Sequence, residues 1–210
     1  MLAHLNDLMM RKKIIWVIIP VIILVAWLSF TGGGQEAYVE QVQEKIEERK
    51  HYLKTNSGSP FLQYGEPYRE PEYYPIDATY RVNATVERIS PRKIVSVANS
   101  NAGIERYEEF AWLNFSIQGE RQKLLVLRPT GFGAMNVLFL AFTDATSAGE
   151  TYGGGRYLEV EIGKSDKLVL DFNLAYNPYC AYTDQFTCPL PPRENLLSVA
   201  IRAGEMNFPK

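Results

Sequence analysis

Both cysteines of the chain lie in one short, proline-rich segment, residues 171–195, with the sequence DFNLAYNPYCAYTDQFTCPLPPREN. Thiolates are nucleophiles and metal ligands, and two nearby thiols can form a disulfide, so Cys180 and Cys188 are the first candidates for chemistry. Four interpretations fit them: a metal site, a reactive thiol, a disulfide, or two buried reduced thiols. Each interpretation makes a different demand on the residues around the cysteines.

A metal site or a reactive thiol would need partners that the sequence supplies poorly. Structural zinc takes four ligands, so Cys180 and Cys188 would have to be joined by carboxylates such as Asp171 and Glu194. A catalytic thiol needs a base, and the only histidine after residue 34 is His51, on a separate predicted helix. Outside the cytoplasm a disulfide is favoured, with reduced buried thiols as the alternative. We predict no metal and no cofactor.

Three consecutive glycines in residues 150–158, ETYGGGRYL, form a second candidate. Open backbone N–H groups can approach an anion, and Arg156 beside them could hold a carboxylate or a phosphate. The segment matches neither GxxxxGK[ST] nor a GxGxxG that opens a helix, and a strand-like run follows it. A glycine turn that leads into a strand is therefore favoured, and anion binding stays open.

Three carboxylates flank the glycine turn and the cysteine segment, as general acid–base chemistry would require: Asp144, Glu150 and Asp171. The chain has 24 acidic residues, so closeness in sequence is weak evidence for a catalytic pair. Solvated surface positions are the favoured interpretation of these three groups.

The overall composition indicates one medium-sized domain with an accessory segment. The chain has 210 residues, and its hydrophobic content of 46% is ample for a core. The net charge of −2 gives no excess of positive charge that would indicate nucleic-acid binding.

A membrane anchor is predicted at residues 14–31, an uncharged segment that directly follows the basic residues 11–13. At about 1.5 Å per residue the segment spans roughly 27 Å, close to the hydrocarbon thickness of a bilayer. The preceding basic residues predict a cytoplasmic tail at residues 1–13 and place the rest of the chain outside. A cleaved signal peptide, cut after Gly34, is the alternative.

Residues 32–58 are predicted to form a linker and a short amphipathic helix. Glycines 32–34 make a flexible joint, and the helix is expected over residues 35–54. Its apolar face contains Val39, Val42, Ile46 and Leu53, and Arg49 interrupts this stripe. Because of that interruption, packing against the following domain is favoured over a stalk that pairs with another chain.

Residues 59–210 are predicted to form one β-rich domain outside the membrane, beginning with an extended, proline-rich connector. From Asp77 onwards the sequence shows short runs of alternating apolar residues, separated by turn signals and without a helical pattern. The runs are residues 78–89, 93–98, 109–117, 122–128, 136–142, 155–162, 166–172 and 196–202. This pattern predicts a mainly β fold, an antiparallel sandwich or barrel-like domain. Several runs are apolar at both alternating sets, as in strands that are covered on both faces.

Long segments of the chain resemble an uncharacterised prokaryotic family, domain of unknown function 1684. The resemblance is carried by YYPIDATYRVNATVE, FTDATSAGETYGGGRYLEVE and LDFNLAYNPYCAYTDQFTCPLPPRENLLSVAIRAGE, and it extends over roughly residues 40–208. It implies a bacterial or archaeal source and supplies no activity, cofactor or substrate. Members similar to this chain also occur without an anchor, which keeps the interpretation of reduced thiols open.

The resemblance singles out polar residues that could line one pocket. The candidate pocket residues are Tyr152, Arg156, Tyr157, Asp171, Asn173, Tyr176, Asn177 and Glu205. We predict that Arg156 reaches the cysteine segment and forms a charge-assisted pair with Asp171 or Glu205.

Three functions remain open at this point. The first is a noncatalytic module that binds a partner or a small ligand, as an accessory subunit of a membrane complex. The second is a hydrolase-like enzyme that uses Asp171 or Glu205, with Arg156 as the anion holder. The third is a purely structural protein. The expected partners are the lipid bilayer, through residues 14–31, and a membrane protein, with no nucleic acid. The expected location is the bacterial cytoplasmic membrane, as a single-pass protein whose domain lies in the periplasm or outside.

Overall fold

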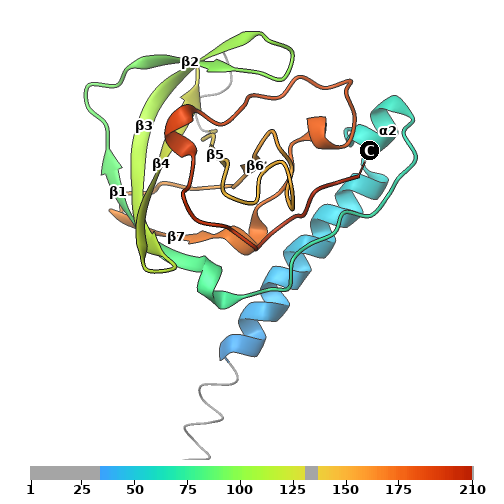
Figure 1. Ribbon diagram of the computed structural model, residues 1–210, viewed down its shortest axis with the longest axis horizontal. Helices are drawn as coiled ribbons and strands as arrows, with labels where there is room; N and C mark the ends of the chain where they lie inside the picture. The colour runs from blue at the N-terminus through green and yellow to red at the C-terminus, as the bar shows by residue number, and fades with distance from the viewer. Residues whose placement is uncertain (1–33, 131–136, 210) are drawn as a thin grey trace, which may run out of the picture. The chain divides into compact units, whose positions relative to one another are not determined.

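A computed structural model of the chain describes residues 34–130 and 137–209 (Figure 1). Within these ranges no helix has the length and apolar character needed to cross a bilayer. The predicted anchor at residues 14–31 lies outside the described residues and stays a prediction.

The predicted amphipathic helix is present over residues 34–55. From Glu44 onwards it belongs to the same compact unit as the rest of the chain, up to Lys210. Ile46 and Leu53 are buried, and Leu53 packs in a cluster with Phe61, Tyr182 and Phe208. Residues 44–55 therefore pack against the domain, with the last part of the chain beside them (Figure 1).

The segment after this helix was expected to be extended, but it contains a short helix, α2 (Pro60–Tyr64). Ser59 caps its N-terminus by accepting a hydrogen bond from Leu62 N–H, and Pro60 stands in its first turn. Gly65, with φ of 70°, ends it in the left-handed conformation that glycine adopts readily. Among the described residues of the domain, four 3₁₀ turns follow: η1 (Ala78–Tyr80), η2 (Phe172–Leu174), η3 (Tyr179–Ala181) and η4 (Arg193–Asn195).

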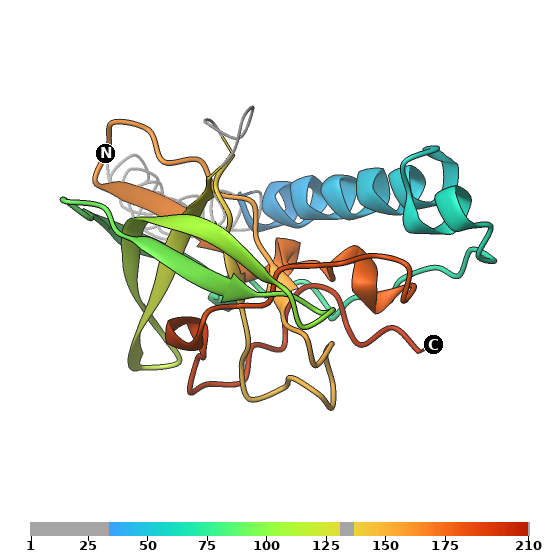
Figure 2. The same ribbon diagram turned by 90° about the horizontal axis from the view of Figure 1, so that it is seen from above.

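The centre of the domain is a five-stranded antiparallel sheet. Its strands are β1 (Arg81–Arg88), β2 (Ile94–Ala98), β3 (Ile104–Ile117), β4 (Glu120–Pro129) and β7 (Lys167–Asp171). The long strand β3 pairs with β4 along one edge, and with β2 and then β1 along the other. β7 pairs with β1. Figure 2 shows the twist of these strands.

The β3–β4 hairpin closes through the two residues Gln118 and Gly119, which follow the paired residues Ile117 and Glu120. Gln118 has φ of 53° and Gly119 has φ of 80°. Two positive φ values are what a type I′ turn requires, and the twist of that turn matches the twist of the flanking strands. This local chemistry fixes the register of the hairpin.

Strand β4 is covered on both faces, as the sequence predicted. Leu124 and Val126 belong to the main core, whereas Leu125 and Leu127 belong to a second cluster with Val97 and Tyr107. Successive side chains of a strand point to opposite faces, so a run of four buried residues requires apolar cover on both sides.

The second half of the domain has much less regular sheet than predicted. β5 (Ala141–Phe142) and β6 (Arg156–Tyr157) pair as a two-stranded sheet, in place of the longer strands expected at residues 136–142 and 155–162. The strand predicted at residues 196–202 is wrong, because no strand forms there. The mainly β fold with antiparallel sheets is confirmed.

The missing strand at residues 196–202 has a physical explanation. Leu197, Val199 and Ile201 are all buried, so alternate side chains point into the core, while the backbone bends at residues 198 and 199. Leu196 forms only an isolated bridge with Thr143. Further along, the carbonyl groups of Ile201 and Ala203 bond to the Arg156 side chain instead of a neighbouring strand. Alternation in the sequence therefore indicated which side chains are buried, but it did not indicate a sheet partner.

Candidate functional site

Arg156, at the start of β6, lies at the centre of a buried polar network and is only 1% exposed. Its Nη2 donates to Asp144 Oδ2 at 2.9 Å and to the carbonyl oxygen of Ile201 at 2.8 Å. Its Nη1 donates to the carbonyl oxygens of Ala203 and Glu205. The three carbonyls belong to residues 201–205, a segment without regular strand structure, so the guanidinium supplies the donors that a strand partner would otherwise provide.

Asp144, the ion-pair partner of Arg156, is held by further hydrogen bonds to its other carboxylate oxygen. Its Oδ1 accepts hydrogen bonds from Thr146 N at 2.8 Å, Thr146 Oγ1 at 2.6 Å and Ile201 N at 3.2 Å. Burial lowers the pKa of Arg156 from its ordinary value, and the charge of Asp144 opposes that shift. The pair joins β6 to the C-terminal segment and uses most of the polar atoms of both side chains.

Two predictions about these charged groups are corrected by this geometry. The ion-pair partner of Arg156 is Asp144, rather than Asp171 or Glu205, and Arg156 reaches Glu205 through a backbone carbonyl. Asp144 was interpreted as a solvated surface group, but it is buried. Glu150 does lie on the surface, where it pairs with Arg202.

Glu205 forms the second half of the network and is fully buried. Its carboxylate accepts from Asn177 N at 3.1 Å, Asn177 Nδ2 at 2.8 Å, Tyr182 OH at 2.6 Å and Tyr73 OH at 3.5 Å. Arg49 Nε lies 3.8 Å from Oε2. Burial raises the pKa of Glu205, and Arg49, Tyr182 and Asn177 oppose the rise.

The backbone that places Glu205 depends on glycine at position 204. Gly204 has φ of 78°, and a Cβ atom there would lie 2.6 Å from the carbonyl oxygen of Ala175 and 2.7 Å from that of Phe172. Real Cβ atoms do not approach backbone oxygens so closely, so only glycine lets the C-terminal segment pack against residues 172–175.

Arg49 connects the N-terminal helix to this network. Its guanidinium lies 3.9 Å above the ring centroid of Tyr176, and its Nη2 donates to the carbonyl oxygen of Asn177 at 3.0 Å. Tyr176 in turn meets Tyr157 edge to face, at 6.0 Å between centroids. Tyr157 OH donates to the carbonyl oxygen of Pro189 in the cysteine segment.

The structure therefore joins five of the eight candidate pocket residues in one connected network: Arg156, Tyr157, Tyr176, Asn177 and Glu205. The other three candidates have structural contacts of their own. Asp171 caps η2 by accepting from Asn173 N, and Asn173 bonds to both backbone polar groups of Asp77. Tyr152 lies against Gly154, where a Cβ atom would be 2.5 Å from its ring.

Three members of the network were not found from the sequence: Arg49, Tyr73 and Tyr182. For Arg49 a signal was available, because a charged residue on the apolar face of an amphipathic helix requires a buried partner. Tyr73 and Tyr182 lie in tyrosine-rich segments and carried no distinguishing signal.

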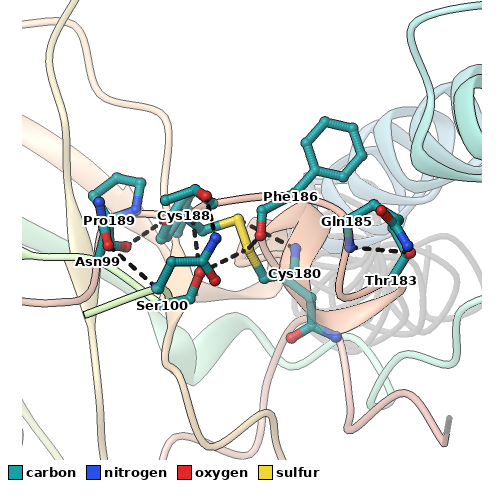
Figure 3. Close-up of a disulfide and its surroundings, with 12 residues drawn as sticks. Asn99, Ser100, Cys180, Thr183, Gln185, Phe186, Cys188 and Pro189 are labelled. Atoms are coloured by element: carbon teal, nitrogen blue, oxygen red, sulfur yellow. Dashed lines mark hydrogen bonds between the residues drawn. A yellow bond between two sulfur atoms is a disulfide. The ribbon is translucent and has the colours of Figure 1, made fainter. Parts of the chain in front are cut away.

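The cysteines form a disulfide, Cys180–Cys188, with a Cα–Cα distance of 6.1 Å (Figure 3). Cys188 N donates to Ser100 Oγ at 3.1 Å, and Ser100 N donates to the carbonyl oxygen of Cys188 at 2.9 Å. The bridged loop therefore docks on the turn that follows β2. The predicted disulfide is confirmed, and it leaves no free thiol in the chain for a reactive or metal-binding role.

Replacing both cysteines by serine is expected to lower the free energy of unfolding by about 2–3 kcal/mol, because the cross-link closes a loop of nine residues. Thermal unfolding of the oxidised wild type and of the double variant measures the difference. As a control, alkylation without reductant should leave Cys180 and Cys188 unlabelled in the wild type. Two labelled cysteines in the unreduced protein would contradict the prediction.

Two observations describe the chemistry that the network has available. Across residues 34–130 and 137–209, no group of three or more His, Cys, Asp or Glu side chains is placed to hold a metal ion. The strongest acid–base candidate, Glu205, is surrounded by protein donors. The network is suited to holding the N-terminal helix, β6 and the C-terminal segment together.

Comparisons with known proteins identify a family and a solved structure whose descriptions give no activity. A family model described as "Protein of unknown function (DUF1684)" matches residues 66–206. Among solved structures, the solution NMR structure of an uncharacterized protein of Haloarcula marismortui is 34% identical, with a TM-score of 0.63. The similarity covers 82% of this chain and 96% of that chain. A search of the curated proteins found no match.

Proposed function

The chain belongs to the DUF1684 family, whose description assigns no activity, and from its geometry we propose a noncatalytic binding module that serves a protein complex at a membrane. One observation supports this proposal most strongly. The polar residues that resemble a catalytic set form their hydrogen bonds and ion pairs with other parts of the protein itself. Arg156 and Glu205 are both fully buried and bonded to protein partners.

A catalytic acid or anion holder must come within hydrogen-bond distance of its substrate. The carboxylate of Glu205 has four hydrogen-bond contacts and a nearby cation. Four hydrogen bonds likewise occupy both Nη atoms of Arg156. The hydrolase-like alternative would have to break these contacts first, which weakens it. The same contacts give Arg156 and Glu205 a structural role. We therefore assign binding to exposed residues on the surface of the domain.

Two apolar side chains are exposed on the β2–β3 hairpin: Ile104 is 71% exposed and Ile94 is 58% exposed. The register places them at opposite ends of the paired segment, and single exposed apolar residues are common on protein surfaces. Recovery of a partner, described below, decides between a binding module and the purely structural alternative.

The membrane location is proposed from the sequence of residues 14–31 and the basic residues before them. Under this proposal the chain crosses the cytoplasmic membrane once, with residues 35–210 in the periplasm or outside. The Cys180–Cys188 disulfide supports this location, because disulfides persist in oxidising compartments.

Extraction of the tagged full-length chain from native membranes in mild detergent is expected to recover a second membrane protein in stoichiometric amount. Mass spectrometry of the purified complex identifies the partner, and native electrophoresis gives its size. The matched control carries residues 1–34 with the same tag and should recover no such partner. A full-length chain that purifies alone would contradict the proposed function.

A further inference from the structure

We propose that the outer edge of β2 is a docking edge that accepts an extended, acidic segment of the partner protein. This inference rests on the proposed binding function and specifies the chemistry of the partner. The mode is strand addition, in which backbone hydrogen bonds supply affinity and neighbouring side chains supply specificity.

The hydrogen-bond phase of β2 shows which backbone groups face outward. Asn99 N donates to Gly103 O at 3.0 Å, and Glu109 N donates to Lys93 O at 2.9 Å, so the odd-numbered residues of β2 bond to β3. In an antiparallel pair, the alternate residues direct their N–H and C=O groups to the other side. Ile94, Ser96 and Ala98 therefore present their backbone groups at the outer edge.

The cysteine segment already uses the far end of this edge. Leu190 N donates to Ala98 O at 2.8 Å, and Ser100 N donates to Cys188 O at 2.9 Å, so residues 188–190 add to β2 as a short antiparallel strand. Figure 3 shows Asn99 and Ser100 beside Cys188 and Pro189. The edge is thus able to accept a strand, and one is seated on it.

A proline stops this pairing. The antiparallel bridge between Asn99 and Pro189 sets the register, which would bring Pro192 opposite Ser96. Proline has no N–H, so Pro192 cannot donate the next hydrogen bond of the ladder. Pro192 instead precedes η4. Within the described residues, no backbone partner is found for the outward groups of Ile94 and Ser96.

The charges around the edge select an acidic partner. Arg92 directly precedes Lys93 and β2 and shares the face of Ile94 and Ser96, and Arg106 pairs with Ser96 across the strands on that face. Within residues 34–130 and 137–209, no salt bridge is found for Arg106.

Glu108, the carboxylate opposite Ile94 on this face, is already engaged by other cations. Glu108 lies 3.2 Å from Arg92 Nη1 and 3.6 Å from Arg128 Nη1. The two guanidinium groups also contact the ring of Phe110, at 4.6 and 4.4 Å from its centroid. Two cations share one anion here, which leaves a net positive charge. An incoming strand with glutamate or aspartate on this face would gain attraction, and exposed Ile94 would add apolar contact.

The test uses the full-length chain in detergent and a synthetic peptide of eight residues in which valine and threonine alternate with glutamate. Binding is expected to protect the amides of Ile94 and Ser96 from hydrogen exchange, measured by NMR. The matched peptide with lysine in place of glutamate should give no protection. Arg106→Glu should weaken binding of the acidic peptide by about tenfold, because it replaces attraction with repulsion.

Ser96→Pro tests the backbone hydrogen bonds of the β2 edge separately from the positive charges around it. The N–H of Ser96 does not face β3, so proline is compatible with the β2–β3 ladder, and the melting temperature should stay near that of the wild type. The variant removes one outward donor and should weaken peptide binding by about tenfold. Ser96→Ala keeps the backbone donor and should bind the peptide like the wild type.

Three results would overturn the inference: no protection by the acidic peptide, unchanged binding by Ser96→Pro, or protected Ile94 and Ser96 amides in the free chain. The last result would mean that another part of the chain or a second copy already covers the edge. The proposed function fails separately. If Ser96→Pro still recovers a stoichiometric membrane partner, the docking edge is refuted and the binding module stands. If no partner is recovered but the peptide binds, the proposed function falls.

Discussion

Replacing Arg156 by alanine is expected to lower the free energy of unfolding by about 3–5 kcal/mol, the usual cost of removing one member of a buried ion pair. The carboxylate of Asp144 would remain buried without its cation. The carbonyl oxygens of Ile201, Ala203 and Glu205 would lose their only side-chain donor at the same time. The total free energy of unfolding of a typical domain is about 5–15 kcal/mol, so the variant should be close to unfolding.

Urea unfolding followed by circular dichroism measures this loss. Arg156→Lys keeps the positive charge but lacks the planar fork that reaches a carboxylate and three carbonyls together, so it should recover only part of the stability. Arg202→Ala is the matched control, because its pair with Glu150 is exposed, and it should unfold at nearly the wild-type midpoint. An Arg156→Ala variant with wild-type stability would show that the buried network is not structural.

Glu205→Ala is expected to cost about 3 kcal/mol or more, because it leaves several buried donors without an acceptor. Asn177 would lose two hydrogen bonds and Tyr182 one, and Arg49 would lose its nearest anion. Glu205→Gln keeps the shape and one acceptor oxygen, so its loss should be smaller. Glu161→Gln, at an exposed position, is the control and should leave the unfolding midpoint unchanged.

The pH dependence of stability gives a second measurement on the same residue. The pKa of Glu205 is raised in the folded state by burial. Between the ordinary carboxyl pKa and the raised one, the folded chain binds more protons than the unfolded chain, so Glu205 makes stability fall as the pH rises. The Glu205→Gln variant should lack this component of the slope. An identical pH profile for wild type and variant would contradict the raised pKa.

The sequence predicted the elements whose signals are local. The alternation in β3 and the doubly apolar run Leu124–Leu127 indicated strands and covered faces, and both are present. The disulfide followed from two cysteines in a short loop. In each case neighbours in the sequence carry the information.

The regions that could not be predicted depend on partners far away in the sequence. Residues 196–202 alternate like a strand, but their carbonyls meet separate donors: Ala145 N bonds to Val199 O, and the Arg156 side chain bonds to Ile201 O. At Asn195, too, a side chain takes the place of a backbone partner, because its side-chain amide bonds to both backbone groups of Leu125. Apolar periodicity reports burial, and it does not report whether a strand or a side chain supplies the hydrogen bonds.

The sequence predicted which of the candidate pocket residues lie together better than it predicted what they do. Tyr176, Asn177 and Glu205 do lie together. Their character as a buried joint was hidden, because it depends on Arg49, which comes from a helix more than 120 residues earlier. The clue to that joint is Arg49 itself, because a charged residue on the apolar face of a helix requires a buried partner.

The attachment of the N-terminal helix also sets an order of events during synthesis. Arg49 bonds to a residue 128 positions later, and Tyr73 to one 132 positions later. Loops of this length close slowly, and these contacts cannot form until residues 177 and 205 have emerged. The first helix of the domain to be made is therefore among the last to dock. For as long as the chain is incomplete, the buried faces of that helix and of Tyr176 stay exposed to other proteins.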